Sequence, residues 1–287
     1  MNSVKAQYIV NEKIKNYDFS FPSEWSELSK KQLLDIAPYL QVWKSIRIDK
    51  ENIEGSQQQH QLILELKIHI FRKLANISEK EWNPRNKCFK DFSVDDISEV
   101  IKNLDWLMSP GLTSDLLPKI RIGSTAFYSS GEYMNVITGA EFFYTEAHYE
   151  SFFKEQNDEA LNKLIAVLYR PAGEGNKHNK NHSEFCGDIR ESFNDNIIQM
   201  RSEKIARLPH KYKCAILNYY EGCRASLVAS HPEVFEKGSS DGKKGSWLNV
   251  FDALSSSFTD LKEVSKEPLA MILFKVTAIK EHSNSKK

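Results

Sequence analysis

The sequence has no surplus of charge of either sign. Lysine and arginine together number 39 among its 287 residues, and aspartate and glutamate also number 39. A chain without net charge generates no global field that would attract nucleic acid or an anionic membrane, so binding of either would need a local patch. We therefore expect no membrane partner, and we do not expect nucleic acid to be the main partner.

Cysteine motifs are also lacking. The four cysteines are widely spaced and form no C-x-x-C motif: Cys88, Cys186, Cys214 and Cys223. A chain of this size buries a substantial core without disulfide staples. The simplest interpretation is a set of reduced thiols in a cytosolic protein.

Long apolar runs are missing as well. No stretch approaches the ~18 apolar residues of a membrane-spanning helix. The beginning of the chain, Met1 to Asn11, lacks the basic start and apolar run of a secretory signal. We expect the protein to remain in the cytoplasm where it is made.

The usual signatures of catalysis are absent. The sequence contains no G-x-S-x-G, H-E-x-x-H or D-x-D-x-D pattern. His69 and His148 are single histidines on helical segments. Side chains that are hydrogen-bonded or that face solvent explain them better than a role in proton transfer. Cys214 and Cys223 lie in an aromatic helical context that is typical of small buried hydrophobic residues. We expect no catalytic residues, no cofactor and no enzyme activity.

The strongest signal that is present is an apolar stripe between Asn157 and Pro171. Its main members fall at the spacing of one helix face: Leu161, Leu164, Ile165 and Leu168. Asn157 is a good N-cap, two acidic residues follow it at the positive end of the helix dipole, and Pro171 cannot donate the next hydrogen bond. The pattern predicts a core helix that needs neighbours on most sides.

Further stripes at helical spacing supply those neighbours, in the segments 33–40, 63–74, 94–104, 197–208, 216–227, 247–261 and 269–279. Ser29 and Gln32 form a capping-box pattern before the first of them, and Pro38 is expected to kink or split that helix. The sequence predicts a mainly α fold, an irregular multi-helix bundle.

A strand-prone segment interrupts the helical pattern at residues 119–137. Ile120 and Ile122 alternate with Arg121, and Gly123 with Ser124 indicates a turn. We expect a small β-hairpin or short-strand insertion there. Near the N-terminus, residues 8–10 and 19–22 are short alternating pieces compatible with edge strands or extended arms. We expect residues 1–55 to form an N-terminal arm or subdomain, residues 56–281 one helical domain, and residues 282–287 a disordered tail.

One arrangement resembles a metal site. His178, His182 and Cys186 are spaced by four residues, and imidazole and thiolate are zinc ligands. The residues between them are polar and two glycines precede them, which favours a surface loop over the helix that this spacing would need. We expect no bound metal. A metal-binding enzyme that uses the 178–186 loop remains the alternative.

A local basic region lies between two predicted helices, with tyrosines nearby. Its members are Arg201, Lys204, Arg207, Lys211 and Lys213. Acidic residues dilute it, so a solvated face is the preferred interpretation. A regulatory nucleic-acid-binding module is a further alternative, and it would bind with strong salt dependence.

Two motifs resemble those of a known family. The first is Phe21-Pro22-Ser23-x-Trp25-x-Glu27-Leu28, and the second is Leu161-x-x-Leu164-Ile165-Ala166-x-Leu168-Tyr169-Arg170-Pro171. Together they resemble helical proteins of tailed-phage structural modules, above all proteins of the tail-assembly chaperone type. The resemblance implies a non-enzymatic chaperone or scaffold of the host cytoplasm that holds an elongated, aggregation-prone tail component before assembly.

The expected partner is therefore another protein, a long helical tail component. Amphipathic helices with wide apolar stripes can leave a groove that takes a partner helix at i, i+4 and i+7. On this interpretation, Leu164, Leu168, Tyr169 and Arg170 organise the partner-binding surface.

Overall fold

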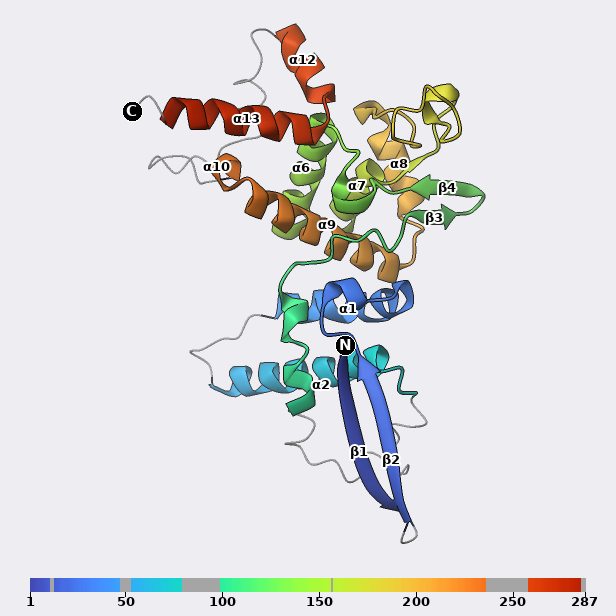
Figure 1. Cartoon of the computed structure of the whole chain (residues 1–287), viewed down its shortest axis with the longest axis vertical. Helices are drawn as coiled ribbons and strands as arrows, with labels where there is room; N and C mark the ends of the chain where they lie inside the picture. The colour runs from blue at the N-terminus through green and yellow to red at the C-terminus, as the bar shows by residue number, and fades with distance from the viewer. Residues whose placement is uncertain (11–12, 47–52, 79–98, 156, 236–257, 285–287) are drawn as a thin grey trace. The chain divides into compact units, whose positions relative to one another are not determined.

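The computed structural model describes residues 1–10, 13–46, 53–78, 99–155, 157–235 and 258–284 (Figure 1). The chain forms two compact units. Unit 1 comprises Met1–Leu112 and His210–Asn218, and unit 2 comprises Thr113–Pro209 and Tyr219–Lys287. The boundary expected near residue 55 falls within the helix Ile53–Leu74, which packs on the helix Lys30–Ser45, and both helices belong to unit 1.

The described chain is mainly α-helical with two small antiparallel sheets, as the sequence predicts. The helices are α1 (Lys30–Ser45), α2 (Ile53–Leu74), α6 (Gly139–Glu155), α7 (Asp158–Leu168), α8 (Ile198–Ile205), α9 (His210–Ser230), α10 (Pro232–Phe235), α12 (Phe258–Lys266) and α13 (Leu269–Asn284). Short 3-10 turns lie at Trp25–Glu27, Asp105–Met108, Glu132–Met134, Asn176–His178 and Asp195–Ile197. None of these helices is both long and apolar enough to span a membrane.

Unit 1 begins with a two-stranded hairpin. Strands β1 (Asn2–Val10) and β2 (Lys13–Phe21) pair antiparallel along their whole length. Phe19 and Phe21 at the end of β2 pack edge-to-face on Phe71 of α2, with ring centroids 5.4 and 5.2 Å apart. The two short strand-like pieces of the sequence are therefore the ends of one longer ribbon that is fixed to the helices by its aromatic residues.

Helix α1 starts where the capping box predicts. The Ser29 side chain accepts the Gln32 backbone N–H at 3.2 Å, and the Gln32 side chain accepts the Ser29 backbone N–H at 3.1 Å. The helix buries Leu33, Ile36 and Leu40 and runs through Pro38 as a single element. The predicted split at Pro38 does not occur.

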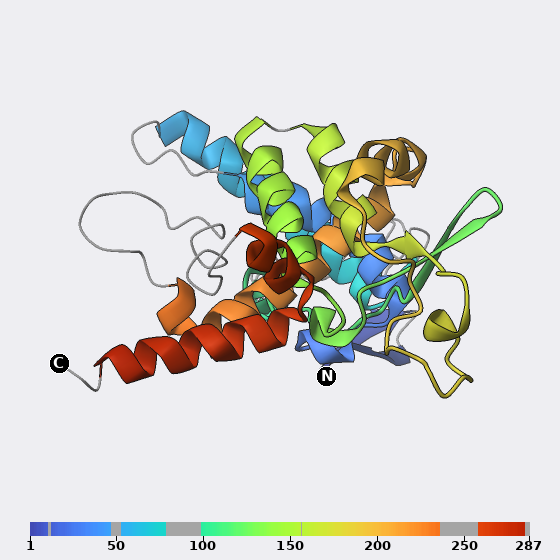
Figure 2. The ribbon, with the colours of Figure 1, turned by 90° about the horizontal axis from the view of Figure 1, so that it is seen from above.

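Unit 2 is organised around α7. The Asn157 side chain accepts the Glu159 backbone N–H at 2.8 Å, which confirms the predicted N-cap. Residues 164–168 of α7 are fully buried on all sides, because α6 and α8 both pack against it. The view from above shows α6 and α7, both yellow-green, beside α8 in gold (Figure 2).

A three-stranded sheet interrupts the helices, in the order β3-β4-β5. Strands β3 (Lys119–Ile122) and β4 (Thr125–Tyr128) form the predicted hairpin, and Gly123 takes a φ of 59° as the first of two turn residues. The third strand, β5 (Arg170–Pro171), follows α7 directly and pairs with β4. The sequence does not predict β5, because a two-residue strand has no periodic pattern.

The C-terminal helices also belong to unit 2. The Leu269 backbone N–H donates to Ile137 O at 2.9 Å, and Gly139 N–H donates to Glu267 O at 3.0 Å, so the start of α13 is joined to the start of α6. Most of the helix predicted at 247–261 falls outside the described residues. Helix α13 continues to Asn284, which extends it into the predicted disordered tail.

We expect Leu164→Ala to destabilise the protein by about 2–5 kcal/mol, because it removes a fully buried side chain of α7 and leaves a cavity. Urea denaturation followed by circular dichroism measures this loss. The matched control is Met200→Ala on α8, where the side chain is 53% exposed and the change should be within about 0.5 kcal/mol. Equal midpoints for the two variants would contradict the central position of α7.

Candidate functional site

The four residues predicted to organise a partner surface lie in the core of unit 2. Leu164 and Leu168 have no exposed area, and Tyr169 and Arg170 are 1% and 2% exposed. The Tyr169 hydroxyl donates to Leu117 O at 2.9 Å, so even its polar end has a partner inside the unit. These side chains support the fold and do not form a surface that a partner contacts directly.

Arg170 is part of a buried ionic cluster formed by Glu141, Arg170, Asp188 and Arg190. Glu141 Oε1 lies 2.8 Å from Arg170 Nη2 and 3.1 Å from Arg190 Nη2. Asp188 accepts from Arg190 Nε at 3.0 Å and Nη2 at 2.8 Å, and from Arg170 Nη2 at 3.2 Å. The cluster joins α6, β5 and the segment that returns from the 172–187 loop.

The environment of the two arginines differs. Burial lowers the pKa of Arg170 to about 10, although Glu141 and Asp188 oppose this shift. For Arg190 the effect of burial is outweighed by Glu141 and by the Asp188 hydrogen bonds, so its pKa is raised. Arg190 also donates from Nη1 to Leu168 O at 2.9 Å and from Nη2 to Val136 O at 3.2 Å. Both guanidinium groups are charged at neutral pH.

A neighbouring ion pair extends this arrangement. Arg201 of α8 lies 2.5 Å from Glu191 and donates from Nη1 to Ala166 O at 2.9 Å. The three buried arginines, Arg170, Arg190 and Arg201, thus face three carboxylates, and the side chains of Glu141 and Arg190 are 2% and 0% exposed. Charges that are balanced and shielded in this way act as structural crosslinks.

Two further ionisable groups that the sequence offers for chemistry are held in their neutral forms. Burial raises the pKa of the Cys223 thiol to about 12, which leaves it a poor nucleophile. Burial, with a smaller contribution from the positive charge of Lys163, lowers the pKa of His148 to about 4. The structure therefore supports the interpretation of Cys223 as a packing residue. His148, in contrast, is half-buried with no hydrogen-bond partner at Nε2 in the described chain, which differs from the expected hydrogen-bonded or solvent-facing side chain.

The candidate metal ligands lie in a loop without α-helix. His178 ends a 3-10 turn and its Nδ1 lies 3.0 Å from Asp188 O, while Cys186 Sγ donates to the same carbonyl at 3.5 Å. The ring of His182 is 4.0 Å from the Glu184 carboxylate. In the part of the chain that the structure describes, no group of three or more His, Cys, Asp or Glu residues is arranged to hold a metal ion.

The residues of the predicted basic region differ in burial and in the unit to which they belong. Arg201 is buried and paired, and Lys211 and Lys213 belong to unit 1, where Lys213 is buried. Of these five residues, Lys204 and Arg207 are the exposed cations that belong to unit 2. The preferred interpretation of a solvated face therefore holds for Lys204, Arg207 and Lys211 but not for Arg201 and Lys213, which lie on buried helix positions.

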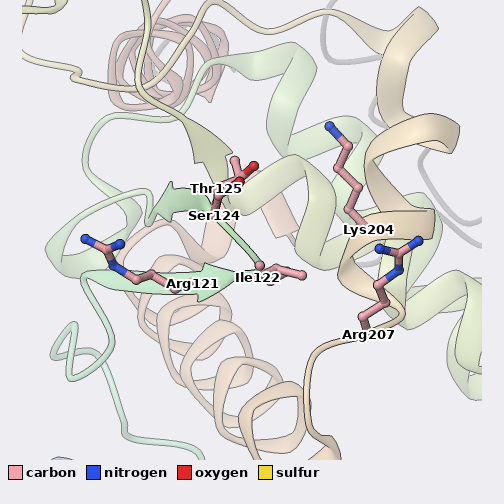
Figure 3. Close-up of a pocket in the computed structure, with 7 residues that line it drawn as sticks. Arg121, Ile122, Ser124, Thr125, Lys204 and Arg207 are labelled. Atoms are coloured by element: carbon pink, nitrogen blue, oxygen red, sulfur yellow. The ribbon is translucent and has the colours of Figure 1, made fainter.

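Lys204 and Arg207 instead share a pocket with the β3–β4 turn (Figure 3). The pocket has a volume of about 430 Å³ and is lined by Arg121, Ile122, Gly123, Ser124, Thr125, Lys204 and Arg207. We call it the turn pocket. Sequence reasoning identified the turn and the two cations separately but missed that they meet, because about eighty residues separate them and no periodicity links a hairpin to a helix end.

Helix α13 carries a second surface feature. Its buried face consists of Leu269, Ile272, Leu273 and Val276. The opposite face carries an apolar row formed by Met271, Phe274 and Ala278, in which Met271 is 48% exposed and Phe274 is 67% exposed. We call these three residues the α13 row. The sequence predicted the buried face of this helix but not that its other face is also apolar.

We expect Glu141→Ala to destabilise the protein by about 3–5 kcal/mol, because it leaves Arg170 and Arg190 buried with one carboxylate between them. Thermal unfolding of the variant measures the loss. Glu150→Ala, at an exposed position of the same helix, is the control and should leave the unfolding temperature near that of the wild type. A small effect at both positions would refute the structural role of the cluster.

The pKa of His148 also predicts a dependence of stability on pH. The unfolded chain takes up a proton near pH 6.5, whereas the folded protein takes it up only near pH 4. Between these values the unfolded state binds more protons, so acidification from pH 6.5 to 4 lowers the free energy of unfolding. We expect denaturation midpoints of the wild type to fall more steeply over this range than those of His148→Gln. Parallel curves for the two proteins would show that the folded protein does not depress this pKa.

Comparison of the chain with protein-family models, with curated proteins and with solved structures finds no match. The resemblance to tail-assembly chaperone-type proteins therefore rests on the two sequence motifs alone, and the surfaces described above carry the functional argument.

Proposed function

We propose that this protein is a non-enzymatic member of a phage or prophage structural module, a tail-assembly chaperone or scaffold that binds an elongated helical partner. The observation that carries the proposal is the α13 row. It places large apolar side chains in solvent on a helix whose other face is already buried in unit 2.

The spacing of the row suits a helical partner. Met271, Phe274 and Ala278 follow each other by three and four residues, which keeps them on one side of the helix. Seven residues of α-helix span about 10 Å, so the row presents two turns to a partner. An amphipathic helix recognised in this way inserts its own apolar residues at i, i+3 or i+4, and i+7.

The position of α13 explains how the row is held. Helix α13 packs on α6 and α10, and hydrogen bonds of its first turn reach the start of α6. Helix α6 in turn packs on α7 and contributes Glu141 to the ionic cluster. On this proposal Leu164, Leu168, Tyr169 and Arg170 act at a distance, since they build the core that supports α6.

The proposal is tested by co-expression with the product of a neighbouring gene that encodes a long helical tail component. We expect the wild-type chain to co-purify with that product and to keep it from aggregating. Phe274→Asp and Met271→Asp should each reduce the recovered complex by about tenfold or more, because a carboxylate would be desolvated in the interface.

Met200→Asp on α8 is the matched control, since it changes another exposed methionine of unit 2 and should leave the complex intact. Circular dichroism must show the same helix content in all variants. The proposal fails if no long helical product is retained, or if retention is the same in Phe274→Asp. It also fails if that substitution only separates copies of this chain from each other.

A further inference from the structure

The turn pocket is lined by cations that have no acidic partner in the described part of the chain. Among the described residues, no carboxylate forms an ion pair with Arg121, Lys204 or Arg207, and none lines the pocket. The arginines elsewhere in unit 2 behave differently: Arg170, Arg190, Arg201 and Arg224 each pair with Asp or Glu. Unit 2 thus pairs its buried arginines with carboxylates, whereas three exposed cations around one pocket have no acidic partner among the described residues.

The geometry of the pocket comes from a turn and a helix end. Gly123 holds a φ of 59°, and no atom lies within 4 Å of the place where its Cβ would be, so the turn backbone is open to a ligand. Ser124 and Thr125 add two hydroxyl groups. On the other wall, the Arg207 backbone N–H donates to Lys204 O at 3.1 Å, a helical turn that keeps the two cations on one side.

The three cations do not all lie on the same side of the pocket (Figure 3). Lys204 and Arg207 stand together on the α8 side of the pocket, whereas Arg121 extends from β3 away from them. The free carbonyl groups at the end of α8 contribute about half a negative charge. The two positive charges of Lys204 and Arg207 are larger than this. The pocket therefore keeps a net positive charge, with Lys204 and Arg207 as its principal sources.

We propose that the turn pocket binds a small phosphate-bearing anion, such as a diphosphate or the phosphate groups of a larger ester. Arginine recognises phosphate through two parallel N–H donors, lysine supplies a point charge, and hydroxyl groups complete such sites. The volume of about 430 Å³ lies within the range of small-ligand pockets. Ile122 is the one large apolar side chain in the lining, so recognition depends on charge rather than on an apolar group of the ligand.

Nucleic acid fits the pocket less well. A strand of DNA or RNA requires a basic stripe along several phosphates, and unstacked bases require aromatic side chains. The turn pocket is one compact hollow without an aromatic residue in its lining, on a chain whose net charge is zero. This anion site does not depend on the α13 row, so either proposal can fail without the other.

The test is isothermal titration of inorganic pyrophosphate into the full chain at low ionic strength. We expect one binding site per chain, an affinity that falls as salt is raised, and a higher melting temperature of the bound protein. Lys204→Gln and Arg207→Gln should each weaken binding by at least about tenfold, since each removes a charge-assisted hydrogen bond. Arg121→Gln should have a smaller effect, because its head group extends away from the other two.

Two controls separate a site from a general effect of charge. Lys177→Gln removes an exposed lysine of unit 2 outside the pocket and should leave the affinity unchanged. Arg207→Lys keeps the charge but removes the two parallel donors, and should still weaken binding several-fold. All substitutions are at exposed positions, so the melting temperatures of the free variants should match that of the wild type.

The proposal is overturned if pyrophosphate shows no saturable binding, or if Lys177→Gln weakens binding as much as Lys204→Gln does. It is also overturned if a single-stranded oligonucleotide or a polyglutamate peptide binds through Lys204 and Arg207 while pyrophosphate does not. Either result would assign the same cations to a macromolecule.

Discussion

Unit 2 depends on the neutralisation of Arg190. Its guanidinium is fully buried, and removing such a charge from water is tolerated only where counter-charges and hydrogen bonds replace the lost solvation. Glu141 and Asp188 provide the charge, and the carbonyl groups of Leu168 and Val136 accept the remaining N–H groups. Since these partners come from separate segments, the position of Arg190 fixes the end of α7, the approach to α6 and the return of the 172–187 loop together.

Buried ion pairs recur elsewhere in unit 2. The buried arginines of unit 2 each face a carboxylate, and the partly exposed Arg224 pairs with buried Glu146 at 2.7 Å. Two surface features of the described chain carry the proposals, the α13 row and the turn pocket. One is apolar and the other is cationic, and both lie on elements that the core holds in place.

Local features of the fold can be predicted from sequence because they depend on neighbours along the chain. The N-cap at Asn157, the capping box at Ser29 and the turn at Gly123 are of this kind, and the structure confirms each of them. The ionic cluster cannot be found in this way, because its members come from α6, β5 and a loop, and no local pattern shows that these charged side chains are buried together. Arg170 was predicted to help organise a partner-binding surface, and Arg201 was placed in a basic region. Only their tertiary partners show that both side chains are buried.

The exposed surfaces are harder to predict from sequence than the helices, because exposure also depends on tertiary structure. Whether an apolar side chain is exposed depends on what covers it. The periodicity of residues 269–279 therefore predicts the buried face of α13 but does not predict that Phe274 is exposed. The turn pocket unites residues 121–125 with 204 and 207, a juxtaposition that no spacing rule contains. The motifs of the family resemblance point to Leu164 and Leu168, which are the residues of a stable core, because sequence signals of helix packing are stronger than those of contact surfaces.

Helix α9 has a practical implication for dissecting the molecule. Its first residues, His210–Asn218, complete unit 1, and the remainder belongs to unit 2. A fragment that stops after Leu112 would lack this piece, and a nine-residue helix supplied separately would be too short to form on its own in water. Truncation after Leu112 therefore cannot yield unit 1 in its native form, and a fragment of unit 1 would need residues 210–218 grafted on by circular permutation or a linker.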